Sequence, residues 1–415
     1  MQRTVVVAGG GISGLTACYH LAKSSSTPKI ILLEGSSRLG GWLLSTRTDD
    51  GAVFEHGPRG IRPAGSVGKN TLNMVSELGL EDEILPVPGD HSASKNRYLY
   101  VNKALHKLPS SISGVLRTIP PFSKPLIWCG LRDFMAKRGT QPDETVHEFV
   151  VRRLGKEVAD IAIDSLCRGV FAGDCRRLSL RSCFPILYEA ERKRRSIILG
   201  MVLAGGERPH FDSALIRRAK KERWSQWSLR SGMETLPEAM EEFLRGRGVQ
   251  IYKDTPLQQL ERTADNRWKG FGHLVPSFED STLLGIVYDS VAFPDQNHCG
   301  AASTRLTVMM GGAWFEVGIG DPDKVSHDQI LCRAREAVTS HLGISETPTR
   351  AIVKLHKACI PQYTLGHWQR TENIFKYLKH QMLPLSVVGA SYEGVSVNDC
   401  IFSARNAVEK LFQYL

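Results

Sequence analysis

The sequence predicts an α/β fold combined with α+β and helical parts, and three observations support this prediction. Near the start of the chain, the strand pattern Thr4–Val7, a glycine-rich turn, the helix pattern Leu15–Ala22 and the strand pattern Lys29–Leu33 follow one another. A strongly basic stretch with a mostly helical pattern covers about 105–221, and a strand pattern returns at Arg305–Gly312. At 415 residues the chain exceeds one ordinary hydrophobic core, so we expect two or three domains.

The composition is that of a soluble globular protein with an excess of positive charge. Hydrophobic residues make up 42% of the chain, charged residues 23%, and the formal net charge is +10. This charge favours an anionic ligand, an anionic membrane surface or nucleic acid, but the sequence contains no nucleic-acid-binding module, so we expect no nucleic-acid partner. No apolar run approaches the ~20 residues of a membrane-spanning helix, and the first residues lack a signal-peptide pattern. Any membrane attachment is therefore expected to be peripheral.

The nine cysteines do not form a metal-binding pattern. None of them belongs to a C-x-x-C pair, and the spacing of Cys167, Cys175 and Cys183 matches no zinc signature. We interpret them as free thiols in a reducing compartment, and we expect no metal site.

The glycine-rich turn predicts a Rossmann-like dinucleotide-binding unit. It has the pattern G-x-G-x-x-G and consists of Gly9, Gly10, Gly11, Ile12, Ser13 and Gly14. In this pattern the first glycine permits a tight turn, the second lets the backbone approach a pyrophosphate, and the third lets the helix pack closely on the strand. Glu34 lies about 20 residues beyond Gly14, where an acidic side chain accepts hydrogen bonds from a ribose. The alternative is a plain glycine turn in another α/β unit.

The residues after the second strand favour FAD over NAD. The stretch EGSSRLGGWLLS contains Glu34, Gly35, Arg38 and the pair Gly40–Gly41. It resembles the second motif of amine-oxidase-type flavoproteins, in which an acid is followed by an arginine and a glycine pair close to the flavin. The sequence therefore predicts a Rossmann-like FAD-binding domain of this type.

Longer motifs carry a closer resemblance that runs nearly end to end. They are FEHGPRGIRPAG (54–65), NRYLY (96–100), DSLCRGVFAGD (164–174), GFGHLVP (270–276), CIPQYTLGHW (359–368) and GASYEGVSVNDCI (389–401). Together they resemble the protoporphyrinogen oxidases of the mitochondrial type. The resemblance implies an FAD enzyme of haem synthesis that oxidises protoporphyrinogen IX to protoporphyrin IX, with oxygen as acceptor and hydrogen peroxide as product. It also implies a homodimer bound peripherally to the mitochondrial inner membrane on its intermembrane-space side.

The same resemblance assigns residues to the cofactor and to the substrate. Besides the glycine turn, Glu34, Gly35 and Arg38, the FAD set comprises Trp42, Gly57, Pro58, Arg59, Gly60, Leu257, Val395, Ser396 and Val397, the last three at a C-terminal strand–helix turn. The substrate set comprises Arg97, Gly272, Leu274 and Met309.

The chemistry of these side chains suits a macrocycle with two propionates. Arg97 offers a planar fork to a carboxylate, although a surface arginine beside a strand is the plainer interpretation. Arg59 is equally compatible with a simple turn, and Leu274 and Met309 with core packing. The sequence offers no general acid or base: His273, His356 and His367 are interpreted as structural. This agrees with a reaction in which hydride passes to the flavin and the protein positions the substrate.

The motifs divide the chain into three expected domains. The FAD-binding domain is discontinuous and comprises 1–90, 225–269 and 383–415, with Met233, Leu236, Met240 and Leu244 forming the apolar face of a helix. A mostly helical membrane-associated domain covers 105–221. A substrate-binding domain with a mixed sheet, truncated relative to the family, covers 91–104 and 270–382.

The chain departs from the family pattern between Lys269 and Gly270. Relatives have a return strand into the FAD sheet and the first strands of the substrate sheet at this point, whereas this chain continues directly into GFGHLVP. Such a loss exposes a sheet edge and can cost many kcal/mol against a total stability of ~5–15 kcal/mol. The alternatives are therefore an inactive, alternatively spliced or misassembled form that binds FAD, a tetrapyrrole or the intact subunit, and a related flavin amine oxidase or desaturase.

Overall fold

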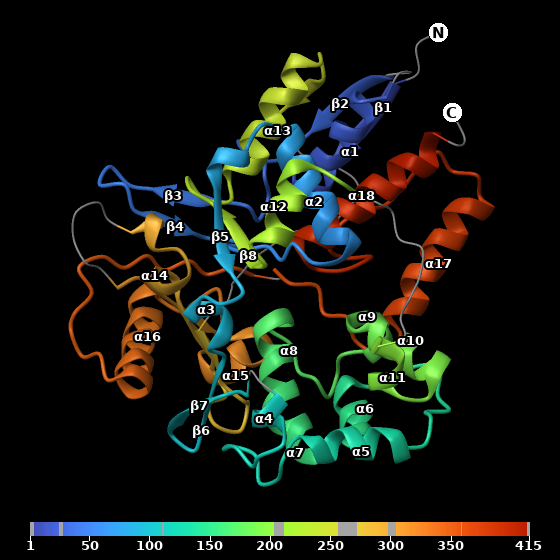
Figure 1. Ribbon diagram of the computed structural model, residues 1–415. Coiled ribbons are helices and arrows are strands. Elements are labelled where there is room, and N and C mark those ends of the chain that lie inside the picture. The colour runs from blue at the N-terminus through green and yellow to red at the C-terminus, as the bar shows by residue number, and fades with distance from the viewer. Residues whose placement is uncertain are drawn as a thin grey trace.

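The computed structural model describes residues 4–24, 28–109, 112–202, 211–255, 272–297, 304–357 and 359–412. In Figure 1 the unit that contains β1, β2, α1, α13 and α18 lies at the top, near both ends of the chain. The helices α5 to α11 lie at the lower right, and α16 and the strands β6 and β7 lie at the lower left.

The elements follow in chain order. The first part contains β1 (Thr4–Ala8), α1 (Ile12–Ala22), β2 (Lys29–Leu33), β3 (Ser45–Arg47), β4 (Val53–Glu55), α2 (Gly65–Glu77), η1 (Glu81–Glu83), β5 (Ile84–Pro88), α3 (Ser92–Lys95), β6 (Tyr98–Val101) and β7 (Ala104–Lys107). The middle part contains α4 (Ile112–Val115), α5 (Ile127–Met135), α6 (Val146–Arg153), α7 (Lys156–Val158), the π-helix η2 (Ala159–Ile163), α8 (Asp164–Phe171), α9 (Leu180–Cys183), α10 (Pro185–Arg194), α11 (Ile197–Val202) and α12 (Ala214–Lys221).

The last part returns to both sheets. It contains β8 (Trp224–Leu229), α13 (Thr235–Gly246), β9 (Gln250–Tyr252), β10 (Gly272–Leu274), β11 (Leu283–Tyr288), α14 (Asp289–Ala292), η3 (Pro294–Gln296), β12 (Leu306–Met310), η4 (Gly312–Trp314), α15 (Phe315–Gly318), α16 (His327–Leu342), α17 (His367–His380) and α18 (Val397–Phe412).

The strand–turn–helix–strand unit forms as the sequence predicts. β1 pairs in parallel with β2, and β2 pairs in parallel with β9, which gives the order β1-β2-β9. Helix α1 connects the first two strands and buries Leu15 and Cys18 completely. The order of strand, glycine turn, helix and parallel strand is that of a dinucleotide-binding unit.

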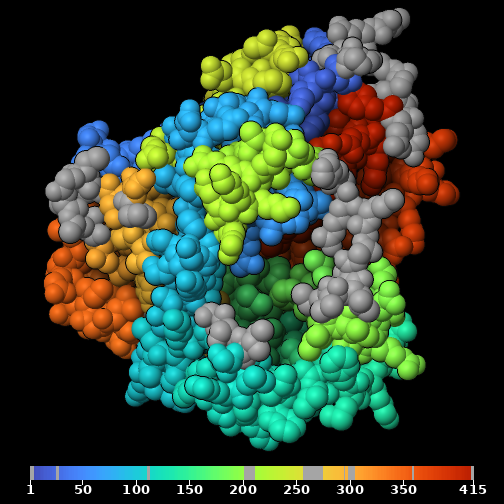
Figure 2. All heavy atoms as spheres, in the orientation of Figure 1, coloured from blue at the N-terminus to red at the C-terminus, as the bar shows by residue number. Residues whose placement is uncertain are grey.

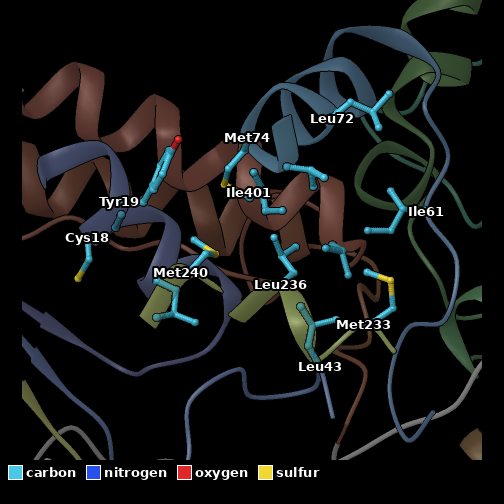
Figure 3. Close-up of a cluster of buried hydrophobic side chains, with 14 of the residues drawn as sticks. Cys18, Tyr19, Leu43, Ile61, Leu72, Met74, Met233, Leu236, Met240 and Ile401 are labelled. Carbon is cyan, nitrogen blue, oxygen red and sulfur yellow. The ribbon is translucent and has the colours of Figure 1, made fainter. Parts of the chain in front are cut away.

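Four helices build the main hydrophobic core beside this sheet. Helix α1 packs on α13 and α18, and α18 also packs on α2. The four predicted apolar residues, Met233, Leu236, Met240 and Leu244, are all fully buried in this cluster. Leu236, Met240 and Leu244 lie on α13 as predicted, whereas Met233 precedes the helix, which begins at Thr235. Figure 3 shows part of the cluster, with Leu236 and Met240 close to Ile401 of α18.

A second, mixed sheet has the order β12-β11-β10-β6-β7. The pair β10–β6 is parallel, and the other pairs are antiparallel. The β6–β7 hairpin turns at Asn102 and Lys103, whose φ angles of 53° and 57° are those of a type I′ turn. The Glu279 carboxylate accepts hydrogen bonds from both of these amides, at 2.9 and 3.0 Å.

The stretch between these sheets is helical, as the sequence predicts. One side of it is held by a fully buried ion-pair group in which Arg153 contacts Asp133 at 3.0 Å and Glu191 at 2.5 Å. Among the described residues no helix is long and apolar enough to cross a membrane.

The strand expected before Val395–Val397 is not formed, and this part of the prediction is wrong. Helix α18 begins at Val397, but 383–396 contains no strand, and Leu383 and Leu385 are 43% and 49% exposed. In the described part of the chain β1 pairs with β2 alone, and Val6 is 55% exposed. A strand forms only where a neighbour accepts its backbone hydrogen bonds, and the described residues offer no such neighbour on this side of β1. The Lys269–Gly270 junction lies outside the described residues.

The core position of Met240 predicts a large cost of truncation. Met240→Ala is expected to lower the free energy of unfolding by about 2–5 kcal/mol, because the side chain is fully buried and leaves a cavity. The control is Met135→Ala in α5, where the methionine is 79% exposed and the expected change is within about 0.5 kcal/mol. Urea unfolding followed by circular dichroism measures both. Equal losses for the two variants would contradict this assignment of the core.

Candidate functional site: a flavin-type dinucleotide turn and an adjoining cavity

The glycine turn has the geometry that its sequence predicts. Gly9 has a φ of +97°, and its amide donates to the Leu33 carbonyl at 2.8 Å. A Cβ atom on Gly14 would lie 1.9 Å from the Gly9 carbonyl oxygen, so the start of α1 packs directly on the turn. A Cβ atom on Gly9 or Gly11 would meet no atom within 4 Å, which leaves the outer side of the turn open. The turn is therefore closed toward the protein and open on the side where a pyrophosphate approaches.

The N-terminus of α1 carries no capping or acidic side chain of its own. Gly11 is the N-cap, no side chain caps the helix, and its first turn, which includes Ile12 and Ser13, contains no acidic residue. The first amides of a helix carry partial positive charge and require acceptors. This end of α1 fits an anionic group of a ligand, such as a diphosphate.

Glu34 closes over the same turn at the end of β2. One carboxylate oxygen accepts from the Gly10 amide at 2.6 Å, and the other accepts from the Ser36 amide at 2.8 Å. Gly35, the next predicted residue, is exposed. The acid thus lies directly beside the turn, as the prediction of a ribose contact requires.

Arg38 organises the second glycine pair. Its guanidinium donates to the carbonyls of Leu39 at 3.0 Å and Leu43 at 3.2 Å, and also to that of Gly41. The Gly40 amide in turn donates to the Gly10 carbonyl at 2.9 Å. The backbone of the pair Gly40–Gly41 therefore packs on the backbone of the glycine turn at Gly10. Trp42 is the next residue in the chain.

The loop Gly57–Gly60 is held against Trp42. A Cβ atom on Gly57 would lie 1.5 Å from the Trp42 carbonyl oxygen, so no other residue fits there. After Pro58, the Arg59 side chain is 3% exposed, and its Nη1 lies 2.5 Å from Asp289 Oδ1. Burial lowers the pKa of the Arg59 guanidinium, and the nearby Asp289 opposes this shift. Gly60 leads to Ile61, whose amide donates to the Trp227 carbonyl at 2.8 Å.

The C-terminal turn joins the same region. The Ser396 hydroxyl accepts from the Asp399 amide at 3.1 Å at the start of α18, between Val395 and Val397. Asn398 donates to the Arg62 carbonyl at 3.0 Å, which ties the turn to the loop after Gly60. Tyr363, from the CIPQYTLGHW motif, accepts from the Gly394 amide at 2.9 Å. Leu257, another residue of the predicted FAD set, lies outside the described residues.

The four predicted substrate residues lie on neighbouring strands of the mixed sheet. Arg97 precedes β6, and the register His273↔Tyr98 places Gly272 of β10 beside it. Leu274 pairs with Gly285 of β11, and Gly285 pairs in turn with Met309 of β12. Leu274 and Met309 belong to one apolar cluster, in which Met309 is 2% exposed. Burial and the nearby Arg62 lower the pKa of Arg97.

A cavity of about 1520 Å³ lies between the β3–β4 hairpin, β12, α16 and the segment 344–362. Met309 is the one predicted substrate residue among those that line it. The polar lining includes Glu55, Asp289 and Arg305, and apolar side chains of β12 and α16 form much of the rest. Asp289 and Arg305 were not predicted from the sequence, although an acid directly after the apolar strand LLGIVY is a recognisable signal.

Arg168 is a third residue of this region that was not predicted from the sequence. It is 1% exposed in α8, and its guanidinium donates to the carbonyls of Val275 at 2.9 Å, Asp280 at 2.8 Å and Leu283 at 3.2 Å. Burial lowers its pKa to about 10. The motif DSLCRGVFAGD therefore fastens the helical part to the mixed sheet.

One group of metal-type ligands occurs among the described residues, at Asp164, Asp174 and Cys175, whose ligand atoms lie within 4.8 Å of one another. The Asp164 oxygens already accept from the Ser277 amide at 2.7 Å and from Arg176 at 3.3 Å. The expectation of no metal site stays a prediction.

Comparisons with known proteins agree with this geometry. The family description "Flavin containing amine oxidoreductase" matches residues 12–269. Protoporphyrinogen oxidase of Bos taurus is 50% identical in an alignment of 471 residues, and this alignment covers 99% of this chain and 98% of the relative. The Homo sapiens protein of the same name is 50% identical over 467 residues, with 98% of each chain covered. The crystal structure of a putative protoporphyrinogen oxidase from Exiguobacterium sp. 255-15 superposes with a TM-score of 0.75 at 20% identity and covers 100% of both chains.

The fold and the glycine-rich site thus define a flavin-containing amine oxidoreductase. Within this class the chain belongs to the protoporphyrinogen oxidase family, as the identity to its mammalian relatives establishes. The bovine alignment runs to 471 residues, more than the 415 of this chain, so the relative contains residues that have no counterpart here.

The contact between Gly14 and Gly9 yields a direct test of the turn. Gly14→Ala is expected to lower the free energy of unfolding by about 3 kcal/mol and to reduce the flavin content, because the methyl group would displace the turn from α1. The control is Gly246→Ala at the end of α13, where a Cβ atom meets nothing within 4 Å and helix propensity favours alanine. Flavin absorbance per mole of protein and thermal unfolding measure the effects. A Gly14→Ala protein as stable and as flavin-rich as its parent would refute the close packing.

Proposed function

We propose that this chain catalyses the FAD-dependent oxidation of protoporphyrinogen IX to protoporphyrin IX in haem biosynthesis, with oxygen as acceptor and hydrogen peroxide as product. The observation that carries the proposal is the intact flavin-type turn in a chain that is 50% identical to protoporphyrinogen oxidase of Bos taurus over 99% of its length. The mixed sheet also supports the proposal, because its register brings the predicted substrate residues together. Gly272 lies beside Arg97, and Leu274 is connected to Met309 through Gly285.

FAD fits the residues that surround the glycine turn. The uncapped end of α1 and the open side of Gly11 suit the diphosphate, and Glu34 suits a ribose hydroxyl. The loop Gly57–Gly60 and the turn Val395–Val397 supply the surfaces for the flavin ring. When bound, FAD supplies the hydride acceptor of the reaction.

The protein's part in the reaction is to bind and orient a large apolar macrocycle. Arg97 pairs with a propionate, since a half-buried guanidinium offers two parallel donors to a carboxylate. Leu274 and Met309 form an apolar wall, and the adjoining cavity of about 1520 Å³ has room for a tetrapyrrole. Holding the reacting carbon against the cofactor accounts for the rate enhancement, and no general base is required.

Anaerobic mixing with substrate tests the proposal. The purified chain is expected to show the visible absorption of bound flavin, and protoporphyrinogen IX is expected to bleach it without oxygen. Admission of oxygen is then expected to restore the absorption and to release hydrogen peroxide. Retained flavin that is bleached by a polyamine and not by the porphyrinogen would identify a related amine oxidase instead.

A second candidate function follows from two observations: this chain is shorter than its bovine relative, and the edge of β1 that faces away from β2 has no described partner strand. The bovine relative contains residues that this chain lacks, and β1 has one described neighbour with Val6 55% exposed. These observations favour a shortened form that binds FAD or a tetrapyrrole, or that pairs with an intact subunit, without turnover. Flavin that stays oxidised in the presence of protoporphyrinogen IX would establish this function and exclude the first.

We further propose a peripheral location on the intermembrane-space side of the mitochondrial inner membrane and a homodimeric state. The membrane surface is the face of α5 and α11, which pack on each other. Its exposed apolar side chains include Trp128, Phe134 and Met135, which are 59%, 59% and 79% exposed. The exposed basic residues Lys137, Arg138, Arg194 and Arg195 border them. In Figure 2 the teal surface that includes α5 lies at the lower end of the molecule, away from the blue β1 and β2. Aromatic side chains beside cations suit the headgroup level of an anionic bilayer.

Removal of the two aromatic side chains tests this surface. Trp128→Ser with Phe134→Ser is expected to weaken binding to phosphatidylcholine vesicles that contain phosphatidylserine by about tenfold or more, because both side chains lose their apolar burial. Val317→Ser, at a position that is 90% exposed in α15, is the matched control and should leave binding unchanged. Cosedimentation measures both. Unchanged binding of the double variant would place the membrane surface elsewhere.

A further inference from the structure

Asp289 connects the mixed sheet to the loop Gly57–Gly60. It follows directly after β11, and its side chain is 8% exposed. One carboxylate oxygen lies 2.5 Å from Arg59 Nη1, and the other accepts from the Thr307 hydroxyl of β12 at 2.6 Å. A carboxylate that is bound on both oxygens has a fixed orientation, so it also fixes the guanidinium that it contacts.

Arg59 has donors that no described residue uses. Its Nε and Nη2 are buried and have no hydrogen-bond partner in the described part of the chain. A buried donor without an acceptor is unfavourable, and more so when it is charged. Arg305, which lies near the same carboxylate, donates instead to the carbonyls of Gln296 and, at 3.3 Å, Phe293. Of the two arginines near Asp289, Arg59 is therefore the one whose Nε and Nη2 hydrogens have no acceptor among the described residues. These hydrogens are available to a ligand.

The surroundings of Arg59 indicate which ligand takes these hydrogens. Gly57 rests on the Trp42 carbonyl, and the Gly40 amide binds the Gly10 carbonyl at 2.9 Å. An unbroken series of backbone contacts thus leads from the dinucleotide turn to the loop that carries Arg59. A dinucleotide bound at the turn would present its flavin ring on this side of the chain, and this ring carries carbonyl oxygens and ring nitrogens as acceptors.

We propose that Asp289, braced by Thr307, is a positioning residue that holds the Arg59 guanidinium so that Nε and Nη2 donate to acceptor atoms of the flavin ring. This inference rests on the proposed binding of FAD. Asp289 acts on the flavin ring through Arg59 and not by direct contact. Its charge also compensates a guanidinium that is 3% exposed, which an asparagine of the same shape does not do.

A double-mutant cycle on FAD binding tests the inference. Asp289→Asn and Arg59→Met are each expected to raise the Kd for FAD about tenfold or more and to shift the visible absorption band of the bound flavin. The double variant is expected to bind no more weakly than Arg59→Met alone, because Asp289 acts through the arginine. Quenching of flavin fluorescence gives the Kd.

A second buried pair of the same kind provides the matched control. Asp133 and Arg153 are both fully buried in the helical part and lie 3.0 Å apart. Asp133→Asn is expected to lower the thermal stability, as Asp289→Asn does, but to leave the FAD affinity and the absorption band of each folded molecule unchanged. If Asp289→Asn does not fold, Thr307→Val serves in its place and should raise the Kd severalfold and shift the band in the same direction.

Three results would overturn the inference. Additive effects of the two substitutions would show that Asp289 does not act through Arg59. A normal FAD affinity and spectrum in Asp289→Asn, with a raised KM for protoporphyrinogen, would assign the free donors to the substrate. A parent chain that binds no FAD would refute the proposed function together with the inference, whereas the first two results leave the proposed function standing.

Discussion

The cofactor side of this chain depends on three close backbone approaches that only glycine permits. Gly14 lies on the Gly9 carbonyl, Gly40 hydrogen-bonds to Gly10, and Gly57 lies on the carbonyl of Trp42. A Cβ atom would lie 1.9 Å from the Gly9 carbonyl oxygen at Gly14, 1.5 Å from the Trp42 carbonyl oxygen at Gly57 and 2.8 Å from the Leu43 carbonyl oxygen at Gly40. These contacts and the Gly40–Gly10 hydrogen bond bring together three stretches that are separate in the sequence. The uncapped end of α1 lies in the first of these stretches, and the loop that carries Arg59 lies in the third.

Buried arginines connect the parts of the molecule at their junctions. Arg59 joins the flavin-side loop to β11 through Asp289, Arg168 joins α8 to the carbonyls around β11, and Arg153 joins helices of the middle part through Asp133 and Glu191. A buried ion pair adds little net stability, but loss of one partner is costly because the other charge remains buried. Such pairs therefore fix the relative placement of elements more than they strengthen the fold. Arg59 leaves two buried guanidinium nitrogens, Nε and Nη2, without an acceptor among the described residues, whereas Arg168 leaves Nε alone and Arg153 uses all three of its nitrogens.

The open side of β1 shows how the length of the chain affects the fold. A β-branched strand of this kind is usual inside a parallel sheet, where both edges are paired and both faces are covered. Here β1 has β2 as its one described neighbour, and the segment 383–388, which has a strand-like sequence, stays exposed without forming a strand. The local preference of LPLSVV for a strand is not sufficient, because a strand is stabilised by the hydrogen bonds of a neighbour.

The sequence by itself determined the features that depend on local pattern. The order strand, glycine turn, helix and strand, the apolar face from Leu236 to Leu244 and the helical character of the middle part all follow from short-range periodicity and from glycine positions. The resemblance to a known family supplied most of the candidate site residues. Only the tertiary structure decided which distant side chains meet: Arg59 and Asp289 are 230 residues apart, and their contact depends on the register of β11 against β12 and on the packing of the loop Gly57–Gly60. Pairing across such a separation leaves no periodic signal in the sequence, because it arises from the placement of whole elements and not from the preferences of neighbouring residues.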